Sequence, residues 1–275
     1  MRTILTAVLL LATAGSALAL ESQAAHAAQA GHEPVACRLI ADRSPAVVTI
    51  KFLLKDEHGE EETETAGALI DADGLVIASN DAFGSLQARL RGGPSATPTD
   101  IRVLIGDDTQ GVPARFAARD TELGLAWLQI EESKGNYPFI DLTDSAEPAV
   151  GDKMIYVSRM GTFFDRAPMA VESTVTAIVR KPRPLIMPSM NSIAERGLPI
   201  FDASGKVVGV TTLVLPERDE LEGMTRDAMK GFTGVMVLPA KDVVAATARA
   251  REFARQNQPQ PDAEPGKDDQ PAEPK

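Results

Sequence analysis

Cysteine and histidine are scarce in this sequence, with one cysteine and three histidines among its 275 residues. The single Cys37 excludes an intramolecular disulfide. A link to another chain stays open in an oxidising compartment, but the usual habit of cysteine favours a small, partly buried residue. No Cys/His cluster, HExxH string or phosphate-binding glycine loop occurs. We therefore expect no metal and no cofactor.

Basic residues are also too few and too scattered for one large class of partners. The chain has 28 Lys and Arg against 39 Asp and Glu, a formal net charge of −11. Phosphate contacts need clustered Lys and Arg, and this sequence shows no basic stripe, so we expect no nucleic-acid partner. The acidic excess is that of an ordinary soluble protein.

Long apolar runs are missing as well, and the one near the N-terminus is short. Arg2 precedes the apolar run 4–14, and Ala17-Leu18-Ala19 follows it. A bilayer-spanning helix needs roughly 20 apolar residues, so the run fits a signal peptide over 1–19 better than an anchor. The small residues 25–28 offer an alternative cleavage site. We expect export, a periplasmic or extracellular location, and no transmembrane segment after signal removal.

Both ends of the mature chain lack hydrophobic periodicity. Residues 20–37 are rich in Ala, Gln and His and predict a flexible arm, and residues 257–275 form a Pro-rich, acidic segment typical of disorder. Just before this tail, 240–256 carries apolar residues at helical spacing and predicts one helix.

The segments between these ends alternate short β-branched runs with Gly and Pro, which predicts an all-β protein. Asp73-Gly74 and Ser204-Gly205 are hairpin signals, and the first fits a turn better than a calcium loop, because the ligand spacing is wrong. The acidic segment 55–65 predicts a solvated loop. Strands are expected at 46–54, 66–71, 75–79, 101–106, 112–117, 124–130, 153–159, 172–180, 199–202, 206–215 and 232–238.

Five strings, in order along the chain, carry a family resemblance. They are TAGALIDADGLVIASND (65–81), DTELGLAWL (120–128), VGDKMIYV (150–157), RGLPIFDASGKVVGV (196–210) and GVMVLP (234–239). Together they resemble the HtrA/DegP-type branch of the trypsin-like serine proteases. The resemblance implies two chymotrypsin-like six-stranded β-barrels, at 38–133 and 134–239, with a closing helix after the second, so that the second unit extends to 256.

The resemblance also marks three positions where the catalytic residues should stand. That family uses a His base, an Asp that orients it and a Ser nucleophile. This sequence has Asp81, Gly124 and Arg196 at those positions. The backbone donors of an oxyanion hole are in doubt too, because Ala194 and Leu198 replace glycines. We expect an exported pseudo-protease without catalytic residues.

An alternative stays open, in which the chemistry has moved to other side chains. His26, His32 and His58 lie in the arm and the acidic segment, where none is placed as a general base. Asp81 could act on Ser192, although a nearby Arg196 would lower the carboxylate pKa. A divergent serine endopeptidase of the cell envelope is therefore the second hypothesis.

Loss of catalysis need not remove binding, and two further expectations follow. Thr211, Thr212, Leu213 and Val214 could form an open strand edge that accepts a protein or an extended peptide, or they could be a buried core strand, and the two interpretations weigh about evenly. Asp81 and Arg196 carry opposite charges and could pair across the cleft between the barrels. The sequence leaves the partner's identity and the oligomeric state open.

Overall fold

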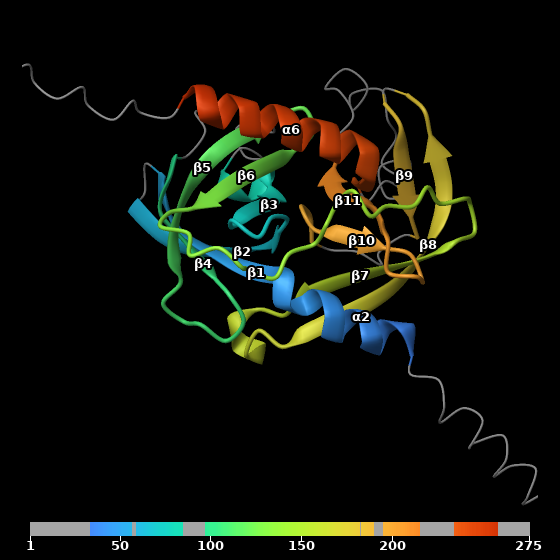
Figure 1. Ribbon diagram of the computed structural model, residues 1–275, viewed down its shortest axis with the longest axis horizontal. Helices are drawn as coiled ribbons and strands as arrows, with labels where there is room; N and C mark the ends of the chain where they lie inside the picture. The colour runs from blue at the N-terminus through green and yellow to red at the C-terminus, as the bar shows by residue number, and fades with distance from the viewer. Residues whose placement is uncertain are drawn as a thin grey trace, which may run out of the picture.

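Two closed antiparallel barrels of six strands each make up the protein in its computed structural model (Figure 1). The structure describes residues 34–56, 59–84, 97–181, 183–189, 195–214 and 234–257. The segments expected to be a signal peptide and a disordered tail, and most of the expected arm, lie outside these residues. The predicted fold class, two barrels with a C-terminal helix, is confirmed.

The first barrel has the strand order β1-β2-β3-β6-β5-β4. Its strands are β1 (Val47–Asp56), β2 (Gly59–Leu69), β3 (Leu75–Ser79), β4 (Thr97–Leu104), β5 (Val112–Asp120) and β6 (Leu125–Ile130). The hairpin expected at Asp73-Gly74 joins β2 to β3, and the Gly74 amide donates to the Asp71 carbonyl oxygen at 3.1 Å.

The second barrel has the strand order β10-β11-β12-β9-β8-β7. Its strands are β7 (Lys153–Arg159), β8 (Pro168–Val179), β9 (Leu185–Pro188), β10 (Pro199–Phe201), β11 (Val207–Leu213) and β12 (Val235–Pro239). The sequence did not predict β9, because prolines at 184 and 188 bracket it and usually signal a break. β9 closes the barrel between β8 and β12.

The acidic segment after β1 is a strand, so the solvated loop predicted over 55–65 is wrong for residues 59–65. Those residues belong to β2 and pair with β1 from Asp56↔Gly59 onward. Cross-strand charges explain the difference: Lys51 Nζ lies 2.8 Å from Glu62 Oε2, and Lys55 Nζ lies 2.9 Å from Glu60 Oε1. Opposite charges facing one another across a ladder stabilise it.

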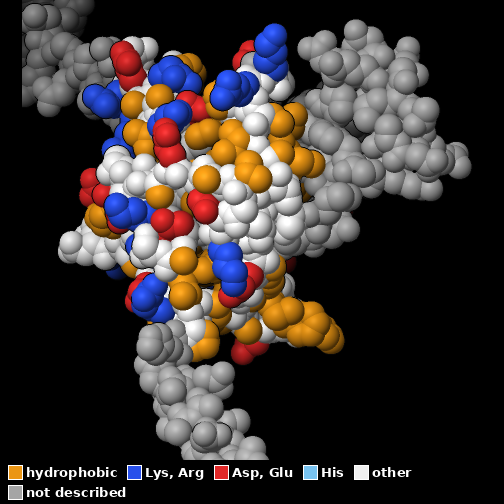
Figure 2. Space-filling view, turned by 90° about the vertical axis from the view of Figure 1, so that its right-hand side faces the viewer, with side chains coloured by type: hydrophobic (Ala, Val, Ile, Leu, Met, Phe, Trp, Pro, Cys, Tyr) orange, Lys and Arg blue, Asp and Glu red, His pale blue; other side chains and the backbone are white. Residues whose placement is uncertain are grey.

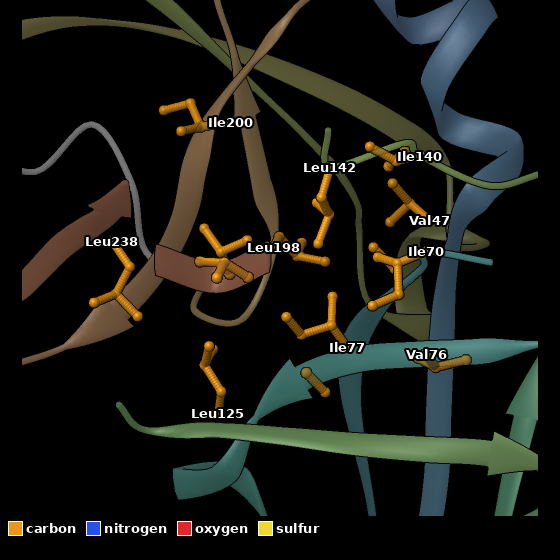
Figure 3. Close-up of a cluster of buried hydrophobic side chains, with 14 of the residues drawn as sticks. Val47, Ile70, Val76, Ile77, Leu125, Ile140, Leu142, Leu198, Ile200 and Leu238 are labelled. Carbon is orange, nitrogen blue, oxygen red and sulfur yellow. The ribbon is translucent and has the colours of Figure 1, made fainter. Parts of the chain in front are cut away.

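One hydrophobic core is continuous through both barrels. Figure 3 shows Ile77 and Leu125 of the first barrel near Leu198 of the second, all three with 0% of their surface exposed. Ile140 and Leu142, from the segment that joins the barrels, are buried in the same cluster. The shared core holds the facing ends of β3 and β10 in place, and the candidate site lies there.

Arg159, at the end of β7, adds polar contacts between the barrels. Its guanidinium donates to the carbonyl oxygens of Val47 at 3.0 Å and Ser44 at 3.2 Å, and to Arg166 within its own loop at 3.2 Å. Ser44 lies in the short 3₁₀ turn η1 (Ser44–Ala46) that leads into β1. One side chain of the second barrel therefore fixes the first strand of the first barrel.

A helix that the sequence did not predict precedes the first barrel but packs on the second. α2 (Val35–Arg43) contacts β7 and β8, and its buried Leu39 lies against Gly205. Arg43 donates to the Gly205 carbonyl oxygen at 2.9 Å. Residues 35–37, expected in the flexible arm, form the first turn of this helix, and Cys37 is an exposed free thiol rather than a partly buried one.

The predicted C-terminal helix is confirmed as α6 (Ala240–Gln256). It crosses the top of the molecule in Figure 1, contacting β5 of the first barrel as well as β11 and β12 of the second. The Trp127 indole N–H on β6 donates to the Thr247 hydroxyl at 3.0 Å, and Arg251 pairs with Asp71. Of the helices that the structure describes, none is long and apolar enough to cross a membrane.

Basic and acidic side chains are interspersed on the face of the molecule that Figure 2 shows. This face is dominated by the second barrel, and neither sign forms a separate patch on it.

Candidate functional site

Asp81 stands where the family resemblance places the general base. It lies in the 3₁₀ turn η2 (Asn80–Phe83), directly after β3, and only 5% of its surface is exposed. The amide of its neighbour Asn80 donates to the Gly124 carbonyl oxygen at 2.9 Å. This hydrogen bond brings the turn after β3 and the turn before β6 together, as the resemblance implies.

Gly124 is next to Asp81, and a side chain at position 124 would have to displace the Thr212 hydroxyl. Its φ is +67°, a left-handed conformation that favours glycine. A Cβ atom built there would lie 3.9 Å from Asp81 Oδ2 but only 2.8 Å from Thr212 Oγ1. The Thr212 hydroxyl, on β11, donates to the Leu123 carbonyl oxygen at 2.6 Å and fills this space.

The third position, Arg196, lies just before β10, and its successor Gly197 contacts the other barrel. Gly197 has φ +82°, and a Cβ there would lie 2.0 Å from Ser79 N. The backbones of β3 and of the 195–198 segment therefore touch without an intervening side chain. The structure brings residues 81, 124 and 196 to one region between the barrels.

A cavity of about 200 Å³ opens at this junction. Arg196 and Glu195 line it from the second barrel, and Asp81 is not among the residues that do. The lining from the first barrel consists of Glu64, Thr65, Ala66, Ser79 and Ala82.

The ion pair expected between Asp81 and Arg196 is not formed. Among the described residues, no ion pair joins Arg196 to a carboxylate. The physical reason is position: the Asp81 carboxylate lies beside Gly124, whereas Arg196 lines the cavity.

Glu195, which sequence reasoning missed, is the best-anchored side chain of this region. Its Oε2 accepts hydrogen bonds from the Tyr156 hydroxyl at 2.9 Å and from the Ser158 hydroxyl. Both donors lie on β7 and are 2% and 0% exposed. Burial, then the negative charge of Glu195, raises the pKa of Tyr156 far above its usual value. The only sequence signal was two hydroxyl residues two apart on one strand, which share a face.

The strand that the sequence offered as a peptide-binding edge is partly enclosed. Thr211 and Thr212 are 0% and 2% exposed, and β11 pairs with β12 as far as Leu213. On its other side, Thr211 N donates to Leu198 O at 2.9 Å, and Gly197 N donates to Thr211 O at 2.7 Å. The buried-strand alternative therefore describes Thr211 and Thr212. Leu213 and Val214 are half-exposed.

Other residues considered at sequence level lie outside the described ranges: Ser192, Ala194, His26, His32, His58 and Leu215. Within the ranges that are described, no three His, Cys, Asp or Glu side chains gather as a metal site would require. Leu198, at the second glycine position, is 0% exposed and packs in the shared core.

Comparison with known families gives one match. The model of the trypsin-like peptidase domain matches residues 65–210, more than half of the chain. The matched range begins in β2, ends in β11 and includes all three positions discussed above. No curated protein matches the sequence.

Proposed function

The chain belongs to the trypsin-like peptidase domain family, and from this membership we propose that it is an exported, catalytically inactive member that binds a protein or an extended peptide. The observation that carries the proposal is the packing at Gly124. Its positive φ and the 2.8 Å approach to Thr212 mean that an aspartate here, the residue that would orient a catalytic imidazole, would be strained and would displace the Thr212 hydroxyl.

The chemistry of the other two positions supports the same conclusion. A guanidinium stays protonated at any physiological pH, so Arg196 can act neither as nucleophile nor as base. Asp81 lies against Gly124. In an active peptidase the first of these positions would carry an imidazole and the second the carboxylate that orients it. The three positions lie in one region between the barrels, and their side chains supply neither the imidazole nor the serine hydroxyl of a triad.

Binding is the function that remains available to such a site. Leu213 and Val214 are half-exposed at the end of β11, where Leu213 pairs with Val235 and Val214 N donates to Gly234 O at 2.7 Å, so an extended chain would add on the side away from β12. The N-terminal leader favours export, so the partner is expected in the periplasm or outside the cell. We place the protein in the HtrA/DegP-like branch on the five sequence blocks.

Two assays on the protein from residue 20 onward test the proposal. We expect casein to remain intact and a fluorophosphonate probe to leave the protein unlabelled, with trypsin as the positive control in both. Stoichiometric labelling that Ser192→Ala abolishes would contradict inactivity and establish the divergent endopeptidase instead. For binding, Leu213→Lys is expected to weaken the retention of envelope peptides, whereas Ile178→Lys, at an exposed residue of β8, is the matched control.

A further inference from the structure

We propose that the outer edge of β2, from Gly59 to Ala66, is a docking site for an extended, basic segment of a partner protein, which adds to it as a strand. This surface lies on the first barrel and differs from the end of β11; at Glu64–Ala66 it reaches the cavity that Glu195 and Arg196 line from the second barrel. The inference depends on neither the catalytic status of the protein nor peptide binding at Leu213 and Val214.

The pairing of β2 leaves this edge open. On one side, β2 pairs with β1 along ten residues, from Val47↔Ala68 to Asp56↔Gly59. On the other side, it pairs with β3 only from Gly67↔Ala78 to Leu69↔Val76. Within the part of the chain that the structure describes, Gly59–Ala66 therefore has a strand neighbour on one side alone.

Ladder geometry identifies the backbone groups that face outward. Ile70 N donates to Leu75 O at 2.8 Å, so the backbone of residue 70 points toward β3. In an antiparallel ladder this direction alternates from residue to residue, and the β1–β2 register runs without a shift. Glu60, Glu62, Glu64 and Ala66 thus direct their N–H and C=O groups to the open edge, where an added strand can pair with them.

The side chains along the edge determine the charge of the partner. Glu60, Glu61 and Glu62 are exposed, and the ion pairs of Glu60 with Lys55 and of Glu62 with Lys51 lie at the surface. Exposed pairs of this kind contribute little to stability, so Lys or Arg from a partner can replace them easily. A second copy is disfavoured, because edge-to-edge pairing would place glutamates opposite glutamates.

An aromatic tip next to the edge supplies an apolar contact. Phe163 and Phe164, in the 3₁₀ turn η3 (Thr162–Phe164), are 89% and 56% exposed and contact one another edge to face. Their loop is fixed to β2 by Glu64, which accepts hydrogen bonds from Thr162 at 2.6 Å and Arg166 at 2.8 Å. Rigid exposed aromatics are typical anchors of protein interfaces.

The test uses a labelled peptide in which Lys and Val alternate, measured by fluorescence anisotropy against the protein from residue 20 onward. Two probes accompany it: one with Glu in place of Lys, and one with alternate backbone amides N-methylated. We expect the basic peptide to bind and to slow amide hydrogen exchange at residues 59–66. We expect the Glu probe and the N-methylated probe to bind at least about tenfold more weakly.

Charge reversal separates the edge from the general acidity of the protein. Glu61→Lys with Glu62→Lys is expected to weaken binding about tenfold, whereas Glu172→Lys with Glu252→Lys changes the net charge equally at exposed residues elsewhere and is expected to leave it unchanged. Equal effects of the two double variants would overturn the proposal, as would equal binding of the N-methylated probe. Exchange protection confined to 211–214 would also contradict it and favour β11. Because the exchange map uses the unaltered protein, the proposal is testable even if a variant fails to fold.

Discussion

Gly124 and Thr212, from different barrels, are in direct contact: a Cβ atom at Gly124 would lie 2.8 Å from the Thr212 hydroxyl oxygen. That hydroxyl is buried and already donates to Leu123 O at 2.6 Å. The position that the family resemblance assigns to the orienting aspartate is therefore crowded by a neighbouring side chain.

An aspartate at position 124 should destabilise the protein. Gly124→Asp adds a left-handed non-glycine residue and crowds Thr212, so we expect a loss of about 2–4 kcal/mol in the free energy of unfolding, measured in urea. Gly106→Asp is the control, because Gly106 has φ +61° with nothing within 4 Å of a built Cβ. It should cost only about 1 kcal/mol. Equal costs would show that the contact with Thr212 is unimportant.

A Cβ atom at Gly197 would lie still closer to its neighbours, and these neighbours are backbone atoms of β3. This Cβ would lie 2.0 Å from Ser79 N and 2.4 Å from Ala78 C, neither of which can rotate away. We expect Gly197→Ala to cost about 3–5 kcal/mol in thermal or urea unfolding. Gly151→Ala, at φ +97° with open space around it, should lose only the conformational part, about 1 kcal/mol. A mild Gly197 variant would contradict the direct backbone contact.

The sequence predicted those strands, helices and turns whose signal lies within the element itself. Strand runs such as 153–159 and the helix 240–256 have strong periodicity, and the structure has both with the same bounds. The Asp-Gly and Ser-Gly turns were also predicted from adjacent residues. Three other elements depend on contacts with distant parts of the chain and were not predicted correctly. β2 extends through Glu60–Glu64 because Lys51 and Lys55 lie opposite; β9 is a strand between prolines because its neighbours hold it; α2 forms against the second barrel.

For the candidate site too, the sequence predicted some features and missed others. The resemblance placed Asp81, Gly124 and Arg196 in one region, and the packing at Gly124 and Gly197 agrees. It could not give side-chain directions, so the Asp81–Arg196 pair was wrong and the anchoring of Glu195 by Tyr156 and Ser158 was missed. Such contacts join residues about forty positions apart and leave no periodic trace in the sequence.

The single tryptophan of the chain reports on the contact between α6 and the first barrel. Thr247→Val keeps the shape of the side chain but removes the acceptor of the Trp127 indole N–H. We expect a loss of about 1–3 kcal/mol and a change in the fluorescence of the folded state. Thr121→Val, at an exposed turn residue, should change neither measurement. An unaltered emission spectrum together with unaltered stability would show that the hydrogen bond is unimportant.

Glu64 should make stability depend on pH in the acidic range. Burial raises its pKa, but hydrogen bonds from Thr162 and Arg166 and the charges of Arg166 and Lys51 outweigh this, so the net pKa lies below its ordinary 4.5. A depressed carboxylate pKa stabilises the folded state above the ordinary value, and this stabilisation is lost as pH falls through the folded pKa. Glu64→Gln should therefore cost on the order of 1 kcal/mol near neutral pH and progressively less below 4.5.

The matched variant for that titration is Glu172→Gln, whose exposed partner Lys153 lies 3.4 Å away. Its stability difference from the unaltered protein should stay near zero across the same range of pH. A Glu64→Gln cost that is constant with pH would mean that the carboxylate is not preferentially ionised in the folded state.

The crossed packing of α2 and α6 makes the two barrels one cooperative unit. α2 precedes the first barrel but packs on β7 and β8, and α6 follows the second barrel but places Thr247 on Trp127 of the first. A cut in the segment between the barrels would give one fragment carrying α2, which packs on the second barrel, and one carrying α6, which packs on both barrels. The first fragment would lack the α6 contacts to β5 and the second would lack α2, whereas the two together could reassemble with both helices in place. The protein is therefore suited to fragment complementation, and its intact chain should unfold in a single transition.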